Sequence, residues 1–213
     1  MASRWQSIPQ NEKGPDKARP FLLPTDECYY LGDYISGGGY AASKINQLIF
    51  NLKKPPHAIG RSVWEYGYKQ NAIAQVAQEL AEALNFENIG SSVTLIPIPP
   101  SKTRGHPEYD DRMMQVCRQI RQQHAPQVEV IDAIEMGQDI GSYHAGGRRL
   151  RPKELERYLR WTVQPGQTLR RYVLLVDDVI TQGAHFRACH SIVSQHAPQS
   201  KIIGLFVART VWI

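Results

Sequence analysis

Two adjacent carboxylates end an apolar stretch in the last third of the chain. Asp177 and Asp178 follow the apolar residues 173–176 and precede a turn at 181–183 made of threonine, glutamine and glycine. A buried carboxylate is costly unless a metal, a cation or a set of hydroxyl groups pairs with it. The pair therefore predicts a binding site at this point of the chain.

The turn after the carboxylates is typical of a phosphate site. Residues 179–184, VITQGA, predict a tight turn into a helix, whose first N–H groups lack partners within the helix and attract an anion. Gly183 allows the backbone to come close to that anion. Carboxylates beside such a turn suit a ribose 5-phosphate, whose hydroxyl groups meet them directly or through Mg²⁺.

The surrounding elements predict the fold class. Apolar, β-branched segments alternate with amphipathic ones, and the expected helices run from Asp110-Asp111 to about Pro126 and around Phe186 to Val193. This order predicts an α/β fold, an open parallel sheet with helices on both faces, in which ligands bind at the carboxyl ends of the strands. The expected strands are Val93 to Pro99, Val128 to Ile134, 172–179 and Lys201 to Thr210.

The N-terminal part is expected to be an addition to one domain over 21–213. Residues 21–60 predict a small hood lobe above a core at 61–213, with a helix over roughly Trp64 to Leu84. Residues 1–20 are polar and contain proline, so we expect a loosely ordered leader. The tyrosines of the hood could stack on a base or fill a small core, and core packing is the commoner use. They are Tyr29, Tyr30, Tyr34 and Tyr40.

Composition narrows the class of protein. The chain of 213 residues is 42% hydrophobic, and no apolar run approaches the roughly 20 residues of a membrane helix. With no apolar secretion signal at its start, we expect a cytoplasmic protein without a membrane partner. The net charge of +5 suits polyphosphate ligands or nucleic acid, although no nucleic-acid-binding module is recognisable. Three well-separated cysteines predict reduced thiols.

The stretch VLLVDDVITQGA, residues 173–184, resembles the phosphoribosyl pyrophosphate (PRPP) signature of type I phosphoribosyltransferases. The resemblance extends over roughly residues 93–210, and its nearest branches are the ComF-type, orotate and amidophosphoribosyltransferase proteins. FVART, residues 206–210, also resembles the last core strand of the ComF group. The resemblance implies the type I fold and a Mg²⁺-dependent transfer of ribose 5-phosphate from PRPP to a nitrogenous acceptor, with release of pyrophosphate.

The resemblance also implies roles for four groups of residues. Asp177 and Asp178 would hold the ribose and Mg²⁺, and the lid would close over the reacting centre and exclude water. In the lid, His144 or Tyr143 could handle a proton, or be a solvated bystander. The 5-phosphate loop comprises Thr181, Gln182, Gly183, Ala184 and His185; the pyrophosphate loop comprises Pro100, Ser101, Lys102, Thr103 and Arg104; the flexible lid includes Tyr143, His144, Arg148, Arg149 and Arg151.

The chain departs from the family pattern at three places. Ala184 and His185 stand where a threonine commonly meets the 5-phosphate, which leaves backbone amides, Thr181 and a protonated His185 for that role. Thr181 stands where purine-salvage members have an aspartate, so the resemblance supplies no general base. Only Cys28 lies in the region where ComF proteins often carry a cysteine-rich zinc module.

These departures leave two other functions open. The chain could be a catalytically inactive regulator that binds PRPP or a nucleotide, with its basic surface on nucleic acid. It could also hydrolyse or transfer another phosphorylated ribose. The acceptor is not identified by any residue, and a homodimer is expected only because dimers are common.

Overall fold

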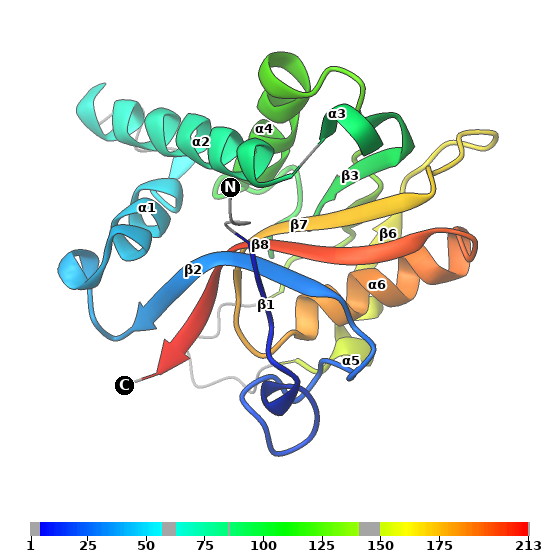
Figure 1. The fold of residues 1–213 in the computed structure, drawn as a ribbon, viewed down its shortest axis with the longest axis horizontal. Coiled ribbons are helices and arrows are strands. Elements are labelled where there is room, and N and C mark those ends of the chain that lie inside the picture. Colours follow the sequence, from blue (N-terminus) through cyan, green and yellow to red (C-terminus); the bar gives the residue numbers. More distant parts are fainter. Residues whose placement is uncertain (1–4, 57–62, 85, 141–149, 213) are drawn as a thin grey trace.

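The computed structural model describes residues 5–56, 63–84, 86–140 and 150–212. Its centre is a six-stranded sheet in the order β1-β2-β8-β7-β3-β4, parallel throughout except for β1, which pairs antiparallel with β2 (Figure 1). The open, mainly parallel sheet predicted from the sequence is confirmed. The strands are β1 Gln6–Ser7, β2 Cys28–Ser36, β3 Val93–Pro97, β4 Glu129–Val130, β7 Tyr172–Ile180 and β8 Lys201–Trp212.

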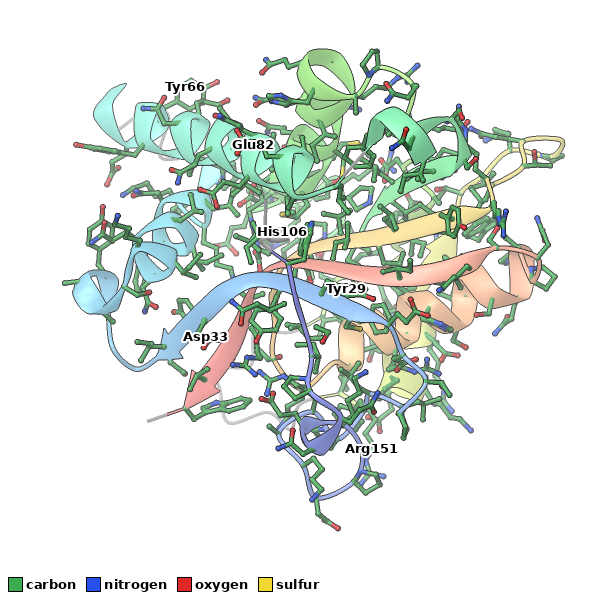
Figure 2. All side chains as sticks on the ribbon, in the orientation of Figure 1. Tyr29, Asp33, Tyr66, Glu82, His106 and Arg151 are labelled. Atoms are coloured by element: carbon green, nitrogen blue, oxygen red, sulfur yellow. The ribbon has the colours of Figure 1, made fainter. Side chains whose placement is uncertain are left out.

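Helices cover both faces of the sheet. In β7, Leu174 and Val176 pack with α1, α2 and α4, whereas Val173 and Leu175 pack on the opposite face with α5 and α6. Side chains fill the space on both sides of the sheet (Figure 2). The continuous apolar strand therefore reflects two buried faces. The helices are α1 Lys44–Leu52, α2 Val63–Ala83, α3 Phe86–Ile89, α4 Arg112–Gln119, α5 Pro152–Glu156 and α6 Ala184–His196.

Short helical turns complete the described part of the chain. They are η1 Gln10–Glu12, η2 Tyr40–Ala42, η4 Gly90–Ser92 and η5 Ile120–His124. Because η5, a π-helical turn, continues α4, the helix predicted to end near Pro126 is present at nearly its full length. The other two predicted helices correspond to α2 and α6. No helix within the described ranges is both long enough and apolar enough to cross a membrane.

The strand predicted over Val128 to Ile134 forms only in part. Two residues, β4, pair with β3, and the chain then leaves the sheet. A separate antiparallel pair follows, β5 Ile134–Met136 with β6 Leu159–Trp161. The apolar residues Ile131 and Ala133 are buried in the core on the α6 side, so packing rather than strand pairing accounts for this apolar run.

The expected hood lobe is not a separate layer. β2, from within residues 21–60, pairs with β8 along almost its whole length, and α1 packs against both β2 and α2. The sequence pattern of residues 21–60 does not say which strand of the core lies beside them, because strand pairing is a contact between distant segments.

The leader is also more ordered than its composition predicts. Residues 5–20 pack along the outer edge of the sheet, where β1 pairs with β2. Ile8 and Arg19 are each only 2% exposed. Strand pairing and buried contacts therefore order residues 5–20, although their polar composition predicts a loosely ordered segment. Residues 1–4 lie outside the described part.

Candidate functional site

The acidic pair lies at an opening in the sheet. β3 ends at Pro97, opposite Val176, and β7 continues beyond it. Asp177 and Asp178 therefore have no partner in β3, although β7 stays paired with β8 as far as Ile180. Asp177 lines two adjoining cavities of about 380 Å³ and about 420 Å³. The carboxylates therefore stand where an open parallel sheet binds its ligand, as predicted.

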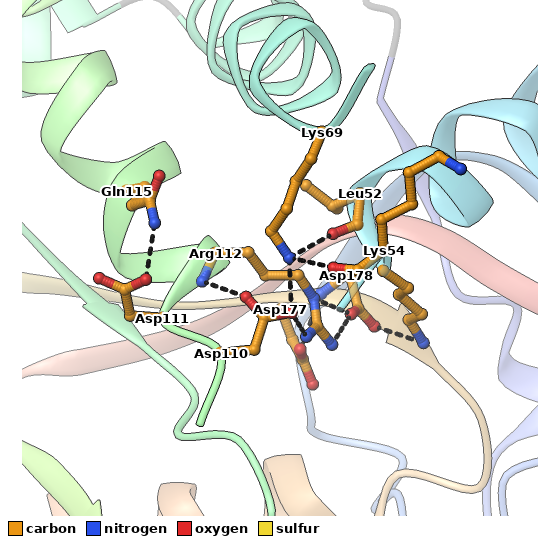
Figure 3. A network of polar contacts seen from close by, with 10 residues as sticks. Leu52, Lys54, Lys69, Asp110, Asp111, Arg112, Gln115, Asp177 and Asp178 are labelled. Atoms are coloured by element: carbon orange, nitrogen blue, oxygen red, sulfur yellow. Dashed lines mark hydrogen bonds and ion pairs between the residues drawn. The ribbon is translucent and has the colours of Figure 1, made fainter. Parts of the chain in front are cut away.

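Asp178 is held by two cations. Arg112, the first residue of α4, donates to Oδ2 through Nε at 2.9 Å (Figure 3). The Nζ atom of Lys53 lies 3.1 Å from Oδ1. Burial opposes ionisation of this carboxyl, but Arg112 and Lys53 outweigh burial and lower its pKa to about 2. Asp178 is therefore ionised and has a cation on each oxygen.

The ion pairs continue into a buried network. Arg112 also donates to Asp110 at 2.8 Å, and the same oxygen of Asp110 accepts from Lys69 at 2.7 Å. Lys69, on α2, further donates to the carbonyl oxygens of Leu52 and Lys54 at the end of α1. The network thus ties α1 and α2 to the acidic pair (Figure 3).

Sequence reasoning missed these four residues as parts of a site. The sequence pattern assigns Asp110 only to the start of a helix, and it gives Lys53 and Arg112 no role. The polar Lys69 within the apolar pattern of α2 was a faint signal, because a buried lysine requires a partner.

Asp177 has a different environment from its neighbour. Its Oδ1 accepts from the backbone N–H of Asp178 at 2.7 Å, and its side chain is half-buried against the cavities. Burial, and then the negative charge of Asp178, raise its pKa to about 7. Of the two carboxylates, Asp177 is the one placed to meet a ligand.

The predicted 5-phosphate loop borders the first cavity. All five of its residues line it, together with apolar side chains that include Leu155, Phe186 and Phe206. α6 begins at Ala184, so the N–H groups of its first turn lie at this cavity. The structure thus brings residues 181–185 together at one cavity, and their role at a 5-phosphate stays a prediction.

The N-terminal segment supports that loop from behind. Gly183 has a φ of +87°, and a Cβ at this position would lie 2.8 Å from the Cδ2 atom of Leu22. The N–H of Phe21 donates to the carbonyl oxygen of Gln182 at 3.3 Å. Gly183 is thus required by backbone geometry and by close packing, in addition to any approach of a ligand.

His185 lines both cavities, but not as the expected cation. Burial lowers its pKa below the ordinary value, against the opposing effect of Asp178. The lowered pKa disfavours the expected protonated form of His185, because burial of the ring penalises its charge. Phosphate binding at this loop then depends on backbone amides and on Thr181.

The predicted pyrophosphate loop only partly faces the second cavity. Pro100, Ser101 and Lys102 line it, opposite Lys53 and Arg112. Lys102 Nζ lies 3.8 Å from a carboxylate oxygen of Glu108, and its side chain is 22% exposed. This cavity is therefore lined by three cationic side chains, and the carboxylates of Glu108 and Asp110 line it beside the acidic pair.

Two residues of the predicted pyrophosphate loop are engaged elsewhere. Arg104 pairs with Asp132 at 2.6 Å and with Glu135 at 3.1 Å, and it does not line the cavity. The N–H of Thr103 donates to Asp139 at 2.7 Å, and Thr103 is likewise not a lining residue. Their expected role is not supported, because acidic residues after β4 provide closer partners.

The predicted lid can be placed only in part. Tyr143, His144, Arg148 and Arg149 lie outside the described residues. Arg151 is exposed, precedes α5 and lines neither cavity. Its backbone N–H donates to the Glu154 carboxylate at 2.7 Å. The neighbouring Leu150 lines the first cavity, so this part of the chain does border the site.

The acidic pair does not fit Mg²⁺ as a direct protein ligand. Both oxygens of Asp178 face cations, and one oxygen of Asp177 accepts a backbone N–H. Among residues 5–56, 63–84, 86–140 and 150–212, no group of three or more His, Cys, Asp or Glu side chains is arranged to hold a metal ion. Of the acidic pair, Asp177 is the carboxylate with an oxygen left for the cavities, and among the described residues Glu108 and Asp110 also line the second cavity.

No protein-family model matches this chain, and no curated protein matches it. Roles can therefore be assigned to individual residues only from the shape and charge of the two cavities. Asp177, Val179 and His185 line both cavities, which makes them one continuous candidate site.

Proposed function

We propose that this chain binds PRPP at the carboxyl ends of β3 and β7 and transfers its phosphoribosyl group to a nitrogenous acceptor, with release of pyrophosphate. The type I phosphoribosyltransferase fold is part of this proposal. The mainly parallel sheet, with an acidic pair at the end of a central strand, supports it.

One observation carries the proposal. Asp177 stands where a cavity bordered by the loop at 181–185 meets a cavity bordered by Lys102, Lys53 and Arg112. A ligand with its 5-phosphate on the loop and its diphosphate beside the cations would place its ribose at Asp177. PRPP has this order of groups, phosphate, ribose and diphosphate, and a carboxylate accepts from ribose hydroxyl groups.

The same geometry can assist bond cleavage. Pyrophosphate leaves C1 with the electron pair of the C1–O bond, and the acceptor nitrogen forms the new bond and releases a proton to water. Lys102 would stabilise the negative charge that develops on the leaving group, whereas Lys53 and Arg112 lie beside Asp178, nearer the ribose. Asp177 would hold the ribose and favour the positive charge that develops at its ring. Arg104, because it is paired with Asp132 and Glu135, has no part in this scheme.

The proposal is tested by release of pyrophosphate. The full chain is incubated with PRPP, Mg²⁺ and a panel of nucleobases, and pyrophosphate is measured by a coupled assay. We expect release with at least one acceptor, and loss of release in Asp177→Asn. Asp16→Asn, the same change at an exposed carboxylate that lines neither cavity, is the matched control. If neither PRPP binding nor release occurs, the proposal is wrong.

A second function is favoured by one observation. Asp178, which would share the ribose hydroxyls with Asp177, is bound by Arg112 and Lys53. A regulator only has to bind PRPP or a nucleotide, so it can function with a carboxylate that is already occupied by cations. An enzyme needs a free carboxylate to hold the ribose during transfer. Tight binding of PRPP without pyrophosphate release would favour the regulator, and its contact with nucleic acid stays a prediction.

Thermal unfolding distinguishes PRPP from a further class of ligand, the nucleoside monophosphates. A ligand that binds only the folded state raises the unfolding temperature. Stronger protection by nucleoside monophosphates than by PRPP would indicate a protein that acts on another phosphorylated ribose.

A further inference from the structure

Two cations already occupy the position at which a divalent metal would compensate the acidic pair. Arg112 contacts one oxygen of Asp178 and Lys53 contacts the other. Both side chains also line the larger cavity, beside Asp177. Their charge therefore reaches the space in which a ribose-phosphate ligand would lie.

The network behind Arg112 fixes this arrangement. Asp110 binds Arg112 on the side away from Asp178, and Lys69 binds Asp110 in turn. Arg112, Asp110 and Lys69 are mostly or fully buried, with side chains 19%, 10% and 5% exposed. Moving Arg112 away from Asp178 would leave a buried carboxylate uncompensated, which is strongly unfavourable.

A metal ion would compete poorly with these contacts. Mg²⁺ prefers an octahedral set of oxygen ligands and gives up its water reluctantly. Here it would meet one available oxygen of Asp177 and be repelled by the guanidinium of Arg112 and the ammonium of Lys53. The carboxylates of this site are thus neutralised by the protein itself.

We infer that Lys53 and Arg112 supply the positive charge expected of Mg²⁺ at the ribose end of the site, so that a ribose-phosphate ligand binds here without the metal. The inference depends on the proposed function, since it concerns the same ligand. It adds Lys53 and Arg112, which lie outside residues 173–184, to the binding site. It also means that the ribose-phosphate ligand does not need Mg²⁺ in order to bind.

Ribose 5-phosphate is the appropriate probe, because it lacks the diphosphate through which PRPP itself holds Mg²⁺. Its dissociation constant is measured by titration calorimetry with the full chain, once in EDTA and once in excess Mg²⁺. We expect the two values to agree within about a factor of 2, a free-energy difference close to the error of such measurements. Binding at least about tenfold tighter in Mg²⁺ would overturn the inference and leave the proposed function in place. Absence of ribose 5-phosphate binding in both buffers would overturn the inference, and the PRPP binding and pyrophosphate-release assay would decide the proposed function separately.

Lys53→Met tests the cation directly. The Lys53 side chain is 44% exposed, so its replacement should preserve the fold, which circular dichroism verifies. We expect binding in EDTA to weaken about tenfold, the order expected for loss of one charged contact, and Mg²⁺ to restore part of it at the vacated oxygen of Asp178. Unchanged binding in EDTA would exclude Lys53 from the site.

Lys54→Met is the matched control. This neighbouring lysine has the same charge, but its ammonium lies over the ring of Tyr68, 6.0 Å from the centroid, and it lines neither cavity. We expect ribose 5-phosphate to bind this variant as it binds the unchanged protein, with or without Mg²⁺. Equal weakening by both substitutions would assign the effect to net charge and overturn the role of Lys53.

Discussion

At the scale of single residues, two identical side chains acquire opposite properties from their surroundings. Asp178 is ionised because Arg112 and Lys53 outweigh the cost of its burial. Asp177 takes up a proton at a higher pH than an ordinary aspartate does, because burial and the charge of Asp178 raise its pKa to about 7. A carboxylate held at a raised pKa beside two cavities is typical of a binding or catalytic group.

Asp177→Asn should stabilise the protein at alkaline pH. The folded-state pKa of Asp177 is raised, so its contribution to stability is present below the ordinary pKa of aspartate and is lost as pH rises through about 7. We expect the variant to gain about 1–3 kcal/mol in free energy of unfolding at about pH 8 and little at about pH 4. Urea denaturation at the two pH values measures this difference, and equal effects at both would contradict the shifted pKa.

The same carboxyl predicts a pH dependence of ligand binding. Binding of ribose 5-phosphate should tighten as pH rises through about 7, because only the ionised Asp177 is a full hydrogen-bond acceptor. The phosphate of the ligand titrates near pH 6, so the comparison with Asp177→Asn isolates the protein group. Parallel affinity profiles for the two proteins, measured by calorimetry, would show that Asp177 is not responsible.

At the scale of elements, the turn between β7 and α6 depends on a distant segment. Leu22 packs against Gly183, and the N–H of Phe21 donates to the carbonyl oxygen of Gln182. Contacts from the N-terminal segment therefore fix the conformation of the phosphate loop. Its positive φ and its close packing both select glycine at position 183.

Gly183→Ala should weaken both the fold and ligand binding. A Cβ in the left-handed region, at 2.8 Å from Leu22, is expected to cost about 1–3 kcal/mol of unfolding free energy and to displace the loop. Leu22 is buried, so Leu22→Ala by itself should cost about 2–5 kcal/mol of unfolding free energy. Because it removes the contact, the double variant should lose less than the sum of the two single losses. Urea denaturation and ribose 5-phosphate titration measure the two effects.

Gly67→Ala is the control for that substitution. Gly67 lies in α2 with nothing within 4 Å of the added Cβ and without a positive φ, so alanine should stabilise the helix by up to about 1 kcal/mol. Similar destabilisation by both substitutions would refute the role of Leu22.

At the scale of the whole molecule, buried charges join the beginning of the chain to its end. Arg19 binds Glu12 at 2.7 Å and the carbonyl oxygen of Thr210, the latter in β8. Arg209 of the same strand binds Glu12 and also Asp33 in β2. These contacts fasten residues 8–27 across the sheet, and the segment in turn supports the phosphate loop.

Arg19→Met should therefore loosen the molecule and its site together. Because Arg19 is 2% exposed, we expect a loss of about 3–5 kcal/mol in unfolding free energy, the usual cost of breaking a buried ion pair. Binding of ribose 5-phosphate should weaken as well. Lys17→Met, at an exposed position of the same segment, should change stability by less than about 0.5 kcal/mol. Unfolding in urea, followed by circular dichroism, measures both variants.

The sequence by itself determined the local features of this protein. The apolar runs that became β3, β7 and β8, the helical spacing of α4 and α6, and the position of Asp177 at the end of a strand all follow from periodicity and from glycine or proline at the boundaries. These features depend on residues within a few positions of one another, so a single sequence records them.

Only the tertiary structure decided the partners. Asp178 pairs with Arg112, 66 residues away, Arg104 turns to Asp132 rather than to the cavity, and β2 joins the sheet beside β8. Alternation tells which residues are buried, and residue type tells which carry charge. Neither alternation nor residue type tells which distant group lies opposite a given side chain, because that depends on the topology and packing of the whole chain.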